Sequence, residues 1–595
     1  MSDKQTTSDK SQINPSESWI RQRLHLLLDT LRHQLAHLDA LPQLTLLGLI
    51  IGVASAGIIV AFRLAVDAPL ELLFSSHAED FESLPRIWHF LLPLLGAFGI
   101  GLLLHYIPKH RRQVSVGHVL DRLHNHQGKL PAYNWAVQFV GGILALLTGQ
   151  SMGREGPAVH LGAGAASQVG QWLRLPNNCL RTLIGCGVAS AIAASFNTPM
   201  AGVIFSMEVI LMEYTIAGFI PVMMASVTGA VIGQMIFGHD PAFSIAPLQM
   251  NTLWELPIIG MAGLIVALFA ATIIRLQLLF NEQHQLPVIA RLTFAGAVTG
   301  ALAFWYPQIL GVGYDTIGAA MHGDLTVQLL IGILFAKVLA TTVSGGLGMP
   351  GGLIGPMLFI GAVLGGIIGI TTNALTPDSG ANPSFYVLLG MGAMMAAVIN
   401  APLAALITVF ELTHNPNTIF PTMLIIVISV IATRQIFRCD GIFIAQLEAN
   451  GFNLNSGPIR QALDRVGVRS VMETRFLRCP HQLTVHQLQQ RLQQHPQWLV
   501  IDDQEKDKYL LAAADVSAFL DNTELSQDDA LQLRSIPGRQ WQLKPIHQQA
   551  SLYEAQQQLQ QFKADALYVE RQASPWLSPV IGVITQDHID NYYRV

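Results

Sequence analysis

The chain has 595 residues, of which 51% are hydrophobic and only 12% are charged, and its formal net charge is −5. Soluble proteins carry roughly 25% charged residues, so this composition excludes a disordered chain and an ordinary cytosolic enzyme. The slightly negative balance also argues against nucleic acid as a partner. Four scattered cysteines offer neither a metal-ligand spacing nor a disulfide framework, so we expect no metal and no required cofactor.

Residues 1–42 form an N-terminal segment that is polar at first. Arginines are interleaved with leucines over residues 16–28, which predicts an amphipathic helix lying on the membrane. A signal peptide would show a short apolar core followed by small residues, and this segment has none. We therefore expect the N-terminus to stay in the cytoplasm.

Residues 43–453 are dominated by apolar runs, which predict a multi-pass membrane domain. The runs include residues 44–62, 91–105, 183–212, 220–237, 258–274, 329–343 and 423–433. From residue 325 to residue 410 the charged side chains are Lys337 and Asp378 alone. A charge at the centre of a bilayer costs about 2.5–3.5 kcal/mol on insertion scales, so membrane-spanning segments are expected to contain few charged residues.

Many of these runs are shorter than the ~20 residues of a full span. Glycine and proline interrupt them at residues 153–157, 198–199, 350–352 and 401–402. Helices that stop inside a membrane are tolerated where their ends are buried in protein or line a polar pathway. The interruptions therefore point to a permeant solute.

The membrane domain contains an internal repeat. Asn197, Pro199 and Glu208 recur at an offset of 203 residues as Asn400, Pro402 and Glu411. A second pair of segments aligns Pro157 with Pro356 at an offset of 199. Two related halves with broken helices in corresponding places are typical of transporters and channels, with the binding site where the broken ends meet.

Residues 454–595 differ in composition, because charged residues and glutamine become frequent and no run could span a bilayer. Residues 484–492 resemble residues 551–559, and the strand-like residues 499–502 resemble residues 567–570. The pattern predicts a water-soluble domain of two small α/β units.

The segment Gly153-Arg154-Glu155-Gly156-Pro157 places a carboxylate at a helix start inside the membrane. Proline suits the first helical turn, and the exposed amides there attract negative charge. An anion could take the place of the carboxylate. The alternative is that Arg154 and Glu155 pair structurally at a helix end.

The second repeat offers a helix start without an acid, at Gly351-Gly352-Leu353-Ile354-Gly355-Pro356. The amides of Leu353 and Ile354 are then available to an anion. A site made of amides and helix dipoles, without a full cationic charge, would bind a halide and still release it.

These motifs, with Ala194-Ser195-Phe196-Asn197-Thr198-Pro199 between them, resemble the CLC chloride channel and transporter family over residues 43–453. The tail, residues 454–595, resembles a pair of cystathionine-β-synthase-type (CBS) units. The resemblance implies an all-α membrane domain built as an inverted repeat of broken helices, followed by a cytosolic α/β CBS pair. It also implies a homodimer with one chloride pathway per subunit.

By this resemblance Glu155 matches a gating glutamate, which blocks an anion site when ionised and leaves it when protonated. The positions that the resemblance assigns to anion binding are Gly153, Arg154, Gly156, Leu353, Ile354, Phe443 and Ser115. Phe443 stands where many members have a tyrosine, and a packed core aromatic is its alternative. Ser115 is a candidate by position, and a helix-cap serine is equally compatible.

Exchangers of the family carry an inner proton-relay acid where this chain has Val209. Because valine cannot take a proton, the sequence favours a passive channel, gated by voltage or pH, over the alternative of a chloride/proton antiporter with another proton route. Glu208 and Glu213 are possible substitutes for the acid. The recurrence of Glu208 as Glu411 favours a structural role at a helix end.

In the tail, Thr585 and Asp587 fit the CBS pattern for phosphate and ribose, while the first unit keeps only Asp515. We expect either one adenine-nucleotide site or a dimerising domain without ligand. A rival of another class is a nucleotide sensor that the membrane part merely anchors. His118, His124 and His126 lack a metal-ligand set and are expected to be solvated.

The resulting expectation is a multi-pass protein of a bacterial inner membrane, with both termini cytoplasmic and the lipid bilayer around residues 43–453. No Ser/His/Asp set or pair of carboxylates is evident within the helices, so we expect no enzyme.

Overall fold

The computed structural model describes residues 40–593, except 75–79, 109–110, 174, 240–242, 244–247, 249, 251, 284–285, 376–381, 452–462, 464–465, 503–507, 524–525, 528, 549 and 571–578. The chain divides into two compact units. The membrane unit holds residues 44–175 and 179–455, and the α/β unit holds residues 456–595 with 1–43 and 176–178. The amphipathic helix predicted over residues 16–28 lies outside the described residues.

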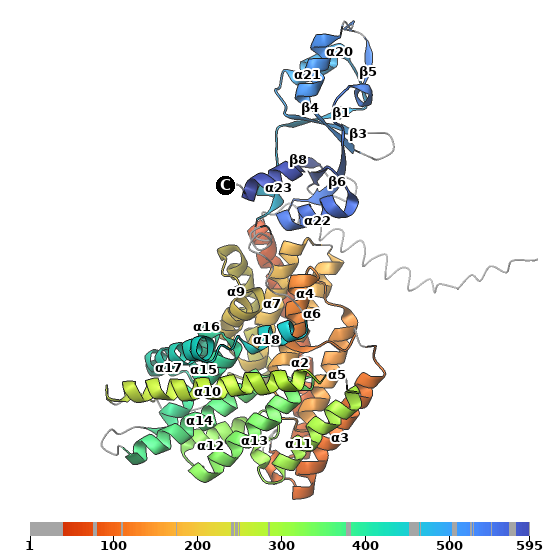
Figure 1. The fold of residues 1–595 in the computed structure, drawn as a ribbon. Coiled ribbons are helices and arrows are strands. Elements are labelled where there is room, and N and C mark those ends of the chain that lie inside the picture. Colours follow the sequence, from red (N-terminus) through yellow and green to blue (C-terminus); the bar gives the residue numbers. More distant parts are fainter. Residues whose placement is uncertain are drawn as a thin grey trace, which may run out of the picture. The chain divides into compact units, whose positions relative to one another are not determined.

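Eight segments of the described chain are helices long and apolar enough to cross a bilayer. They are α2 (Ala40–Leu73), α3 (Arg86–His105), α7 (Asn177–Phe196), α9 (Ile216–Phe237), α10 (Glu255–Asn281), α13 (Val327–Gly346), α14 (Ile354–Leu375) and α17 (Ile419–Ile431) with the 3₁₀ turn η6 (Pro416–Thr418) before it and the π-helix η7 (Ala432–Ile436) after it. The chain is thus a multi-pass integral membrane protein, as predicted. In Figure 1 the helices of this unit run from red to cyan.

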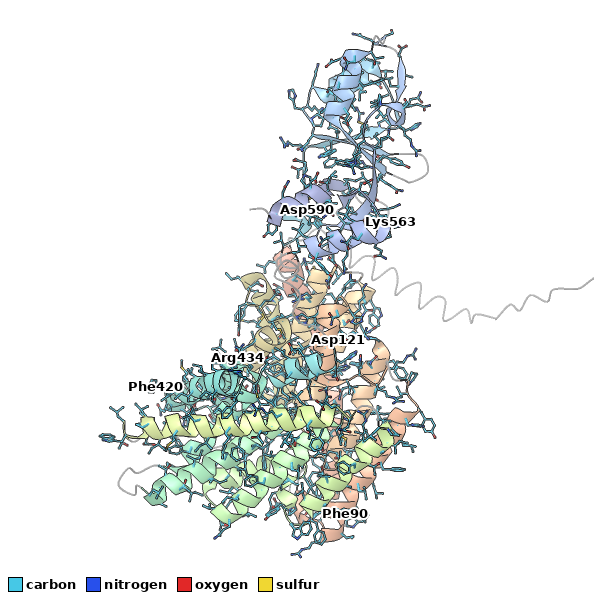
Figure 2. The ribbon with its side chains drawn as sticks, viewed as in Figure 1. Phe90, Asp121, Phe420, Arg434, Lys563 and Asp590 are labelled. Carbon is cyan, nitrogen blue, oxygen red and sulfur yellow. The ribbon has the colours of Figure 1, made fainter. Side chains whose placement is uncertain are left out.

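Shorter helices fill the spaces between the long ones. They are α4 (Ser115–Asn125), α5 (Ala132–Leu147), α6 (Glu155–Trp172), α8 (Pro199–Phe205), α11 (Val288–Ala303), α12 (Tyr314–His322), α15 (Pro383–Ile399), α16 (Pro402–Thr413), α18 (Ile442–Ala449), the π-helix η3 (Ser206–Leu211) and the 3₁₀ turns η1 (Phe81–Ser83) and η4 (Pro307–Ile309). Helices α14 and α15 pack together, as do α3 and α11. Large apolar side chains cover the outside of the unit, for example Phe420, which is 62% exposed and lies at its periphery (Figure 2). Such an exposed apolar surface suits lipid rather than water.

The two predicted breaks at Asn-X-Pro interrupt the helices as expected. Asn197 ends α7 and Asn400 ends α15 in the left-handed conformation, with φ of 57° and 63°. Asparagine tolerates this conformation better than most residues. Pro199 and Pro402 then occupy the first turn of α8 and of α16, where the missing N–H costs nothing.

Two glutamates tie the halves of the membrane unit together reciprocally. The Glu208 carboxylate accepts hydrogen bonds from the amides of Leu403 (3.3 Å) and Ala404 (2.7 Å) at the start of α16. The Glu411 carboxylate accepts from Met200 (2.8 Å) and Ala201 (2.7 Å) at the start of α8. Each half thus supplies the acid that caps the broken helix of the other half. The predicted repeat and the helix-end role of Glu208 are confirmed.

The α/β unit contains a six-stranded sheet in the order β1-β3-β4-β6-β7-β8 and a two-stranded sheet, β2-β5. Its elements are the turn η8 (Val468–Ser470), β1 (Phe476–Pro480), β2 (Gln482–Thr484), α20 (Val485–Leu492), β3 (Trp498–Asp502), β4 (Lys508–Ala512), α21 (Ala513–Asn522), β5 (Ala530–Gln532), the turn η9 (Leu533–Ser535), β6 (Trp541–His547), α22 (Leu552–Phe562), β7 (Ala566–Glu570), β8 (Val580–Thr585) and α23 (Gln586–Tyr593). β1 pairs parallel with β3, and β6 pairs parallel with β7. β3 then pairs antiparallel with β4, and β7 with β8. Each half of the sheet therefore has a parallel pair of strands followed by an antiparallel pair, which confirms the predicted repeat.

Matching caps begin the first helix of each repeat. Thr484 and Gln487 form a capping box at α20, and Ser551 and Glu554 form one at α22. In such a box the side chain of each residue bonds the backbone amide of the other, which fixes the helix start. The unit is compatible with the predicted CBS pair, whose name stays a prediction.

Candidate functional site

The two glycine-rich loops predicted to form the site contact each other in the membrane unit. The Gly153 amide donates to the Gly352 carbonyl (2.8 Å), and the Gly352 amide donates to the Gly153 carbonyl (2.6 Å). Gly156 faces the same loop, since a methyl group added to it would lie 2.5 Å from the Gly351 carbonyl oxygen. The first turns of α6 and α14 therefore lie against each other.

The carboxylate of Glu155 lies at this junction. Glu155 is the first residue of α6 and is 3% exposed. A methyl group at Gly352 would lie 2.8 Å from its Oε2, and one at Gly355 would lie 2.8 Å from its Oε1. The carboxylate thus rests against the first turn of α14, where Leu353 and Ile354 begin the helix. Only glycine leaves room for it there.

Two cavities flank the start of α14. The Ser115 cavity has a volume of about 180 Å³, and its lining includes Ser115, His118, Leu353 and Phe443. The Tyr314 cavity has a volume of about 30 Å³, which is room for water, and its lining includes Glu155, Tyr314 and Ile354. Consecutive residues of one helix start, Leu353 and Ile354, therefore face different cavities.

Ser115 and Phe443 line the same cavity. The Ser115 hydroxyl donates to the Gly351 carbonyl (3.3 Å), and the Ser115 amide donates to Oε1 of Gln138 (2.7 Å). Phe443 is 4% exposed in the first turn of α18. It is therefore a packed aromatic that also forms part of the cavity wall, and its role in anion binding stays a prediction.

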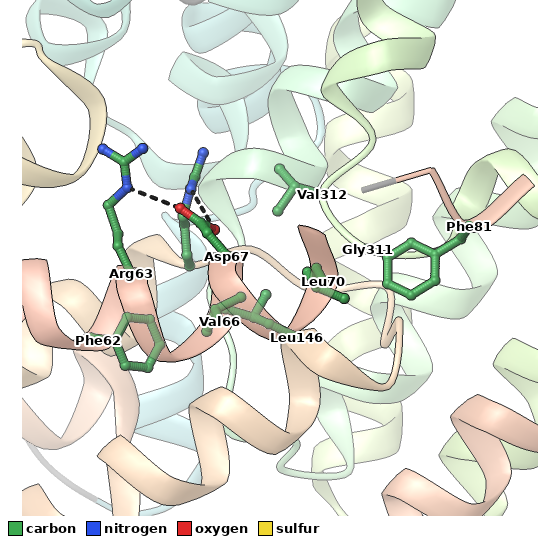
Figure 3. Close-up of a pocket in the computed structure, with 10 residues that line it drawn as sticks. Phe62, Arg63, Val66, Asp67, Leu70, Phe81, Leu146, Gly311 and Val312 are labelled. Carbon is green, nitrogen blue, oxygen red and sulfur yellow. Dashed lines mark hydrogen bonds and ion pairs between the residues drawn. The ribbon is translucent and has the colours of Figure 1, made fainter. Parts of the chain in front are cut away.

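A charged cluster lies next to Glu155 along the chain. Arg154, the N-cap of α6, places Nη1 3.9 Å from Oδ1 of Asp67 on α2, and Nε of Arg63 lies 3.4 Å from Oδ2 of the same carboxylate. Figure 3 shows Asp67 between two guanidinium groups. With Val312 these residues line a cavity of about 10 Å³. The Asp67 carboxylate thus lies within ion-pair distance of two guanidinium groups beside the loop of Glu155.

The position of the expected proton-relay acid is apolar. Val209 is 6% exposed within η3, a π-helix, and Glu208 next to it caps α16. Glu213 follows η3 and is half-buried. Within the described residues, Glu208 is committed to two backbone amides and is poorly suited to shuttle protons.

Two buried residues, Lys337 and His118, make contacts that the sequence did not predict. Lys337 is fully buried on α13, and its ammonium donates to the carbonyls of Ile309 and Gly311 (both 2.9 Å). It therefore holds the loop before Val312, which lines the cavity beside Arg154.

The prediction that His118 is solvated is wrong: it is 5% exposed and contacts His160 of α6. Its partner is 42 residues away, so no local pattern indicates the contact.

The predicted nucleotide residues of the α/β unit lie at helix starts. Thr585 ends β8, and its hydroxyl accepts from the amide of His588 (3.4 Å). Asp587 lies in the first turn of α23 and Asp515 in the first turn of α21. Burial lowers the pKa of His588, and the nearby Glu473 and Asp587 oppose this shift. The Thr585 hydroxyl already caps a helix, so a phosphate would have to share it.

Comparison with known proteins identifies the membrane unit. The sequence model of the family described as "Voltage gated chloride channel" matches residues 95–434, more than half of the chain. The chain belongs to this CLC family. A ClcB-like protein of Ralstonia nicotianae, named as a chloride channel protein, is 32% identical over 351 residues, which are 58% of this chain and 82% of that protein.

Other CLC relatives are named for exchange. The H(+)/Cl(-) exchange transporter ClcA of Yersinia pseudotuberculosis is 28% identical over 408 residues, covering 65% of this chain and 84% of that protein. The crystal structure of a slow cyanobacterial Cl⁻/H⁺ antiporter matches with a TM-score of 0.60 and 23% identity, over 70% of this chain and 99% of that chain. This last likeness shows the fold alone.

Proposed function

We propose that this CLC protein exchanges chloride for protons across its membrane. The observation that carries the proposal is the position of Glu155, whose carboxylate lies against the first turn of α14 between the broken ends of both halves. An anion and this carboxylate would compete for the same helix dipole and amides. Chloride binding and proton binding at Glu155 are therefore linked.

The anion path would run through the helix start that the carboxylate occupies. Leu353 and Ile354 offer backbone amides there, and the Ser115 cavity leads to them from one side. On the side of Arg154, the guanidinium groups of Arg154 and Arg63 would draw an anion toward Glu155. Gly153 and Gly156 keep the two loops close enough for both helix dipoles to act on one ion.

Protonation would supply the coupling. The neutral carboxyl no longer competes with chloride, so it leaves the helix start and chloride enters. When chloride has passed, the carboxyl group releases its proton to the opposite side, and the ionised carboxylate returns to the helix start. The exchanger name of the ClcA relative favours this alternative over the passive channel that Val209 suggested.

The remaining candidate is the passive channel, gated by voltage or pH at Glu155. Val209 supports it, as does the channel name of the Ralstonia relative. Purified protein reconstituted in liposomes separates the two functions: an outward chloride gradient should drive protons inward against a proton gradient. Chloride flux that moves no protons would establish the channel.

The oligomeric state, the membrane and the α/β unit can be proposed as well. We propose a homodimer in a bacterial inner membrane, with both termini in the cytoplasm, and a CBS pair as the α/β unit. Thr585 and Asp587 would bind an adenine nucleotide at α23, with Asp515 at the corresponding helix of the other repeat. Isothermal titration of the full-length protein with ATP tests this, and a Thr585→Val variant should weaken any binding.

A further inference from the structure

The side chain of Gln277 is buried at the wall of the Ser115 cavity without a hydrogen bond. Gln277 lies on α10 and is 1% exposed. It is among the residues that line this cavity, but neither its Nε2 nor its Oε1 has a hydrogen-bond partner among the described residues. Burying a carboxamide without a partner costs free energy, so we expect an occupant of the cavity to bind it.

The nearest polar side chains of α10 on either side of Gln277 do have protein partners. Nη2 of Arg275 donates to the Phe437 carbonyl (2.8 Å). Nδ2 of Asn281 donates to Oδ1 of Asn450 (3.1 Å). Gln277 therefore differs from its neighbours on the helix, because its N–H groups are still available to a ligand.

Two glycines of α13 bring the Gln277 side chain close to the start of α14. A methyl group added to Gly345 would lie 2.7 Å from Nε2 of Gln277 and 3.2 Å from Cδ2 of Leu353. A methyl group added to Gly346 would lie 2.7 Å from the backbone carbonyl oxygen of Gln277. Helix α10 thus approaches the end of α13 closely. Gln277 lies against the same glycine as Leu353, whose backbone amide belongs to the proposed anion site.

The lining of the Ser115 cavity offers an anion neutral donors in place of lysine or arginine. Among the described residues that line it there is no lysine or arginine, and the one acid is Asp121. This acid accepts a hydrogen bond from Asn125 (3.0 Å) and lies 3.6 Å from the ring of His126. Neutral N–H and O–H groups bind an anion weakly enough to release it again, as a transport site requires.

We propose that Gln277 binds the permeant anion in the Ser115 cavity through its side-chain N–H groups, beside the amide of Leu353. This inference rests on the anion path of the proposed function and adds a ligand to it. The carboxamide supplies a hydrogen-bond donor on a side of the cavity where Phe443 has none.

A carboxamide also suits a site that is emptied in each transport cycle. Its two ends are a donor and an acceptor, and rotation about the last side-chain bond exchanges them. The N–H groups face the cavity when an anion is bound. Either end can bond water when the anion has left, so the group is not left unpaired.

The test measures chloride binding to the purified full-length protein. Isothermal titration with sodium chloride, in a buffer with a bulky organic anion, gives the Kd of the wild type and of Gln277→Met. Methionine has the length of glutamine but no N–H group, so we expect the Kd to rise about tenfold.

Thermal unfolding in the same buffer separates a ligand role from a packing role. Gln277→Met removes two buried polar atoms without partners, so in the absence of chloride it should unfold at a temperature no lower than the wild type. Chloride should then raise the unfolding temperature of the variant less than that of the wild type, because stabilisation by a ligand falls as its Kd rises.

Gln168→Met is the matched control. Nε2 of Gln168, on α6, donates to the Leu130 carbonyl (2.7 Å), and the residue is not among those that line the Ser115 cavity. This variant loses a hydrogen bond but no anion ligand. It should keep the wild-type Kd and unfold at a lower temperature, which is the opposite pattern.

A chloride Kd in Gln277→Met equal to that of the wild type overturns the assignment of Gln277 and leaves the proposed exchange intact. A wild type that neither binds nor moves chloride overturns both. A variant that loses chloride affinity together with stability in chloride-free buffer gives Gln277 a packing role and also overturns the assignment. If Gln277→Met does not assemble, Gln277→Leu in the same two measurements decides the question.

Discussion

The loops at residues 153–157 and 351–356 use the same backbone device and differ in two side chains: Arg154 and Glu155 of the first correspond to Leu353 and Ile354 of the second. Each brings a glycine to the shared bridge, and each is followed by a proline in the first helical turn. The first loop carries Glu155, whereas the second has only apolar residues and glycines. One half of the repeat thus provides a competitor for the anion, and the other provides amides that the competitor and the anion share.

Removing the acid should have the largest effect, because it takes away the competitor that only the first loop carries. In Glu155→Gln we expect coupled proton flux to fall at least about 100-fold and chloride flux to lose its dependence on pH. Simultaneous chloride and proton recording measures both. A variant whose chloride flux still varies with pH as in the wild type would contradict the assignment of Glu155.

Pushing the loops apart tests whether their contact is needed. In Gly352→Ala the new methyl group would meet the Gly156 amide and the Glu155 carboxylate, so we expect chloride flux to fall about tenfold. Gly57→Ala is the control, because a methyl group on this α2 glycine meets nothing within 4 Å. Equal fluxes in the two variants would mean that the close approach of the loops is dispensable.

The caps that Glu208 and Glu411 form on each other's halves test whether the two halves are equivalent in stability. In Glu208→Gln or Glu411→Gln, an amide NH₂ would face a backbone N–H in place of a carboxylate oxygen, at a cost of about 1–3 kcal/mol each. Thermal unfolding in detergent should show similar losses for both variants. If Glu208→Gln instead altered proton coupling without changing stability, the acid would belong to the proton path and the symmetry would be only apparent.

The two repeats of the α/β unit can also be compared, by how their stability responds to pH. Burial lowers the pKa of His547 and His588 in the second repeat. The unfolded chain therefore binds more protons near pH 6.5, and this repeat should lose stability as pH falls through that value. For Asp502 in the first repeat, burial raises the pKa, but hydrogen bonds from Lys508 and Arg478 outweigh burial and lower it. Its contribution should persist until pH falls to about 4 and below.

Hydrogen exchange of the full-length protein, corrected for the intrinsic effect of pH, distinguishes the two repeats. Between pH 7 and pH 5 the peptides of β6–α23 should lose protection before those of β1–α21. His588→Gln should reduce this difference. Equal loss of protection in both repeats would show that the buried histidines do not control the acid response.

Much of the fold can be predicted from the sequence, because the residues that start and stop its helices lie close together in the chain. Asn197 and Pro199 stop one helix and start the next, and the same pair of residue types recurs at Asn400 and Pro402. The capping boxes at Thr484 and Ser551 are similarly visible as short motifs. The candidate site is also partly readable, because Glu155 interrupts an apolar run and the second loop has no acid.

The contacts of His118 are not readable in this way. The lack of a metal-ligand set around it indicated a solvated residue, but α4 packs against α6 and buries the ring against His160. Lys337 is likewise conspicuous as a charge in an apolar run, while the carbonyls that hold it come from a separate loop.

The amino-acid sequence by itself determined where helices cross the membrane, where they break, and that a single acid stands at one of two matching breaks. These features depend on hydrophobicity, backbone preference and charge within a few residues. Only the tertiary structure decided that Gly153 pairs with Gly352, that Glu208 and Glu411 cap each other's halves, and that two histidines touch. Such contacts join residues 42 to about 200 positions apart, and their distances depend on how all the intervening helices pack.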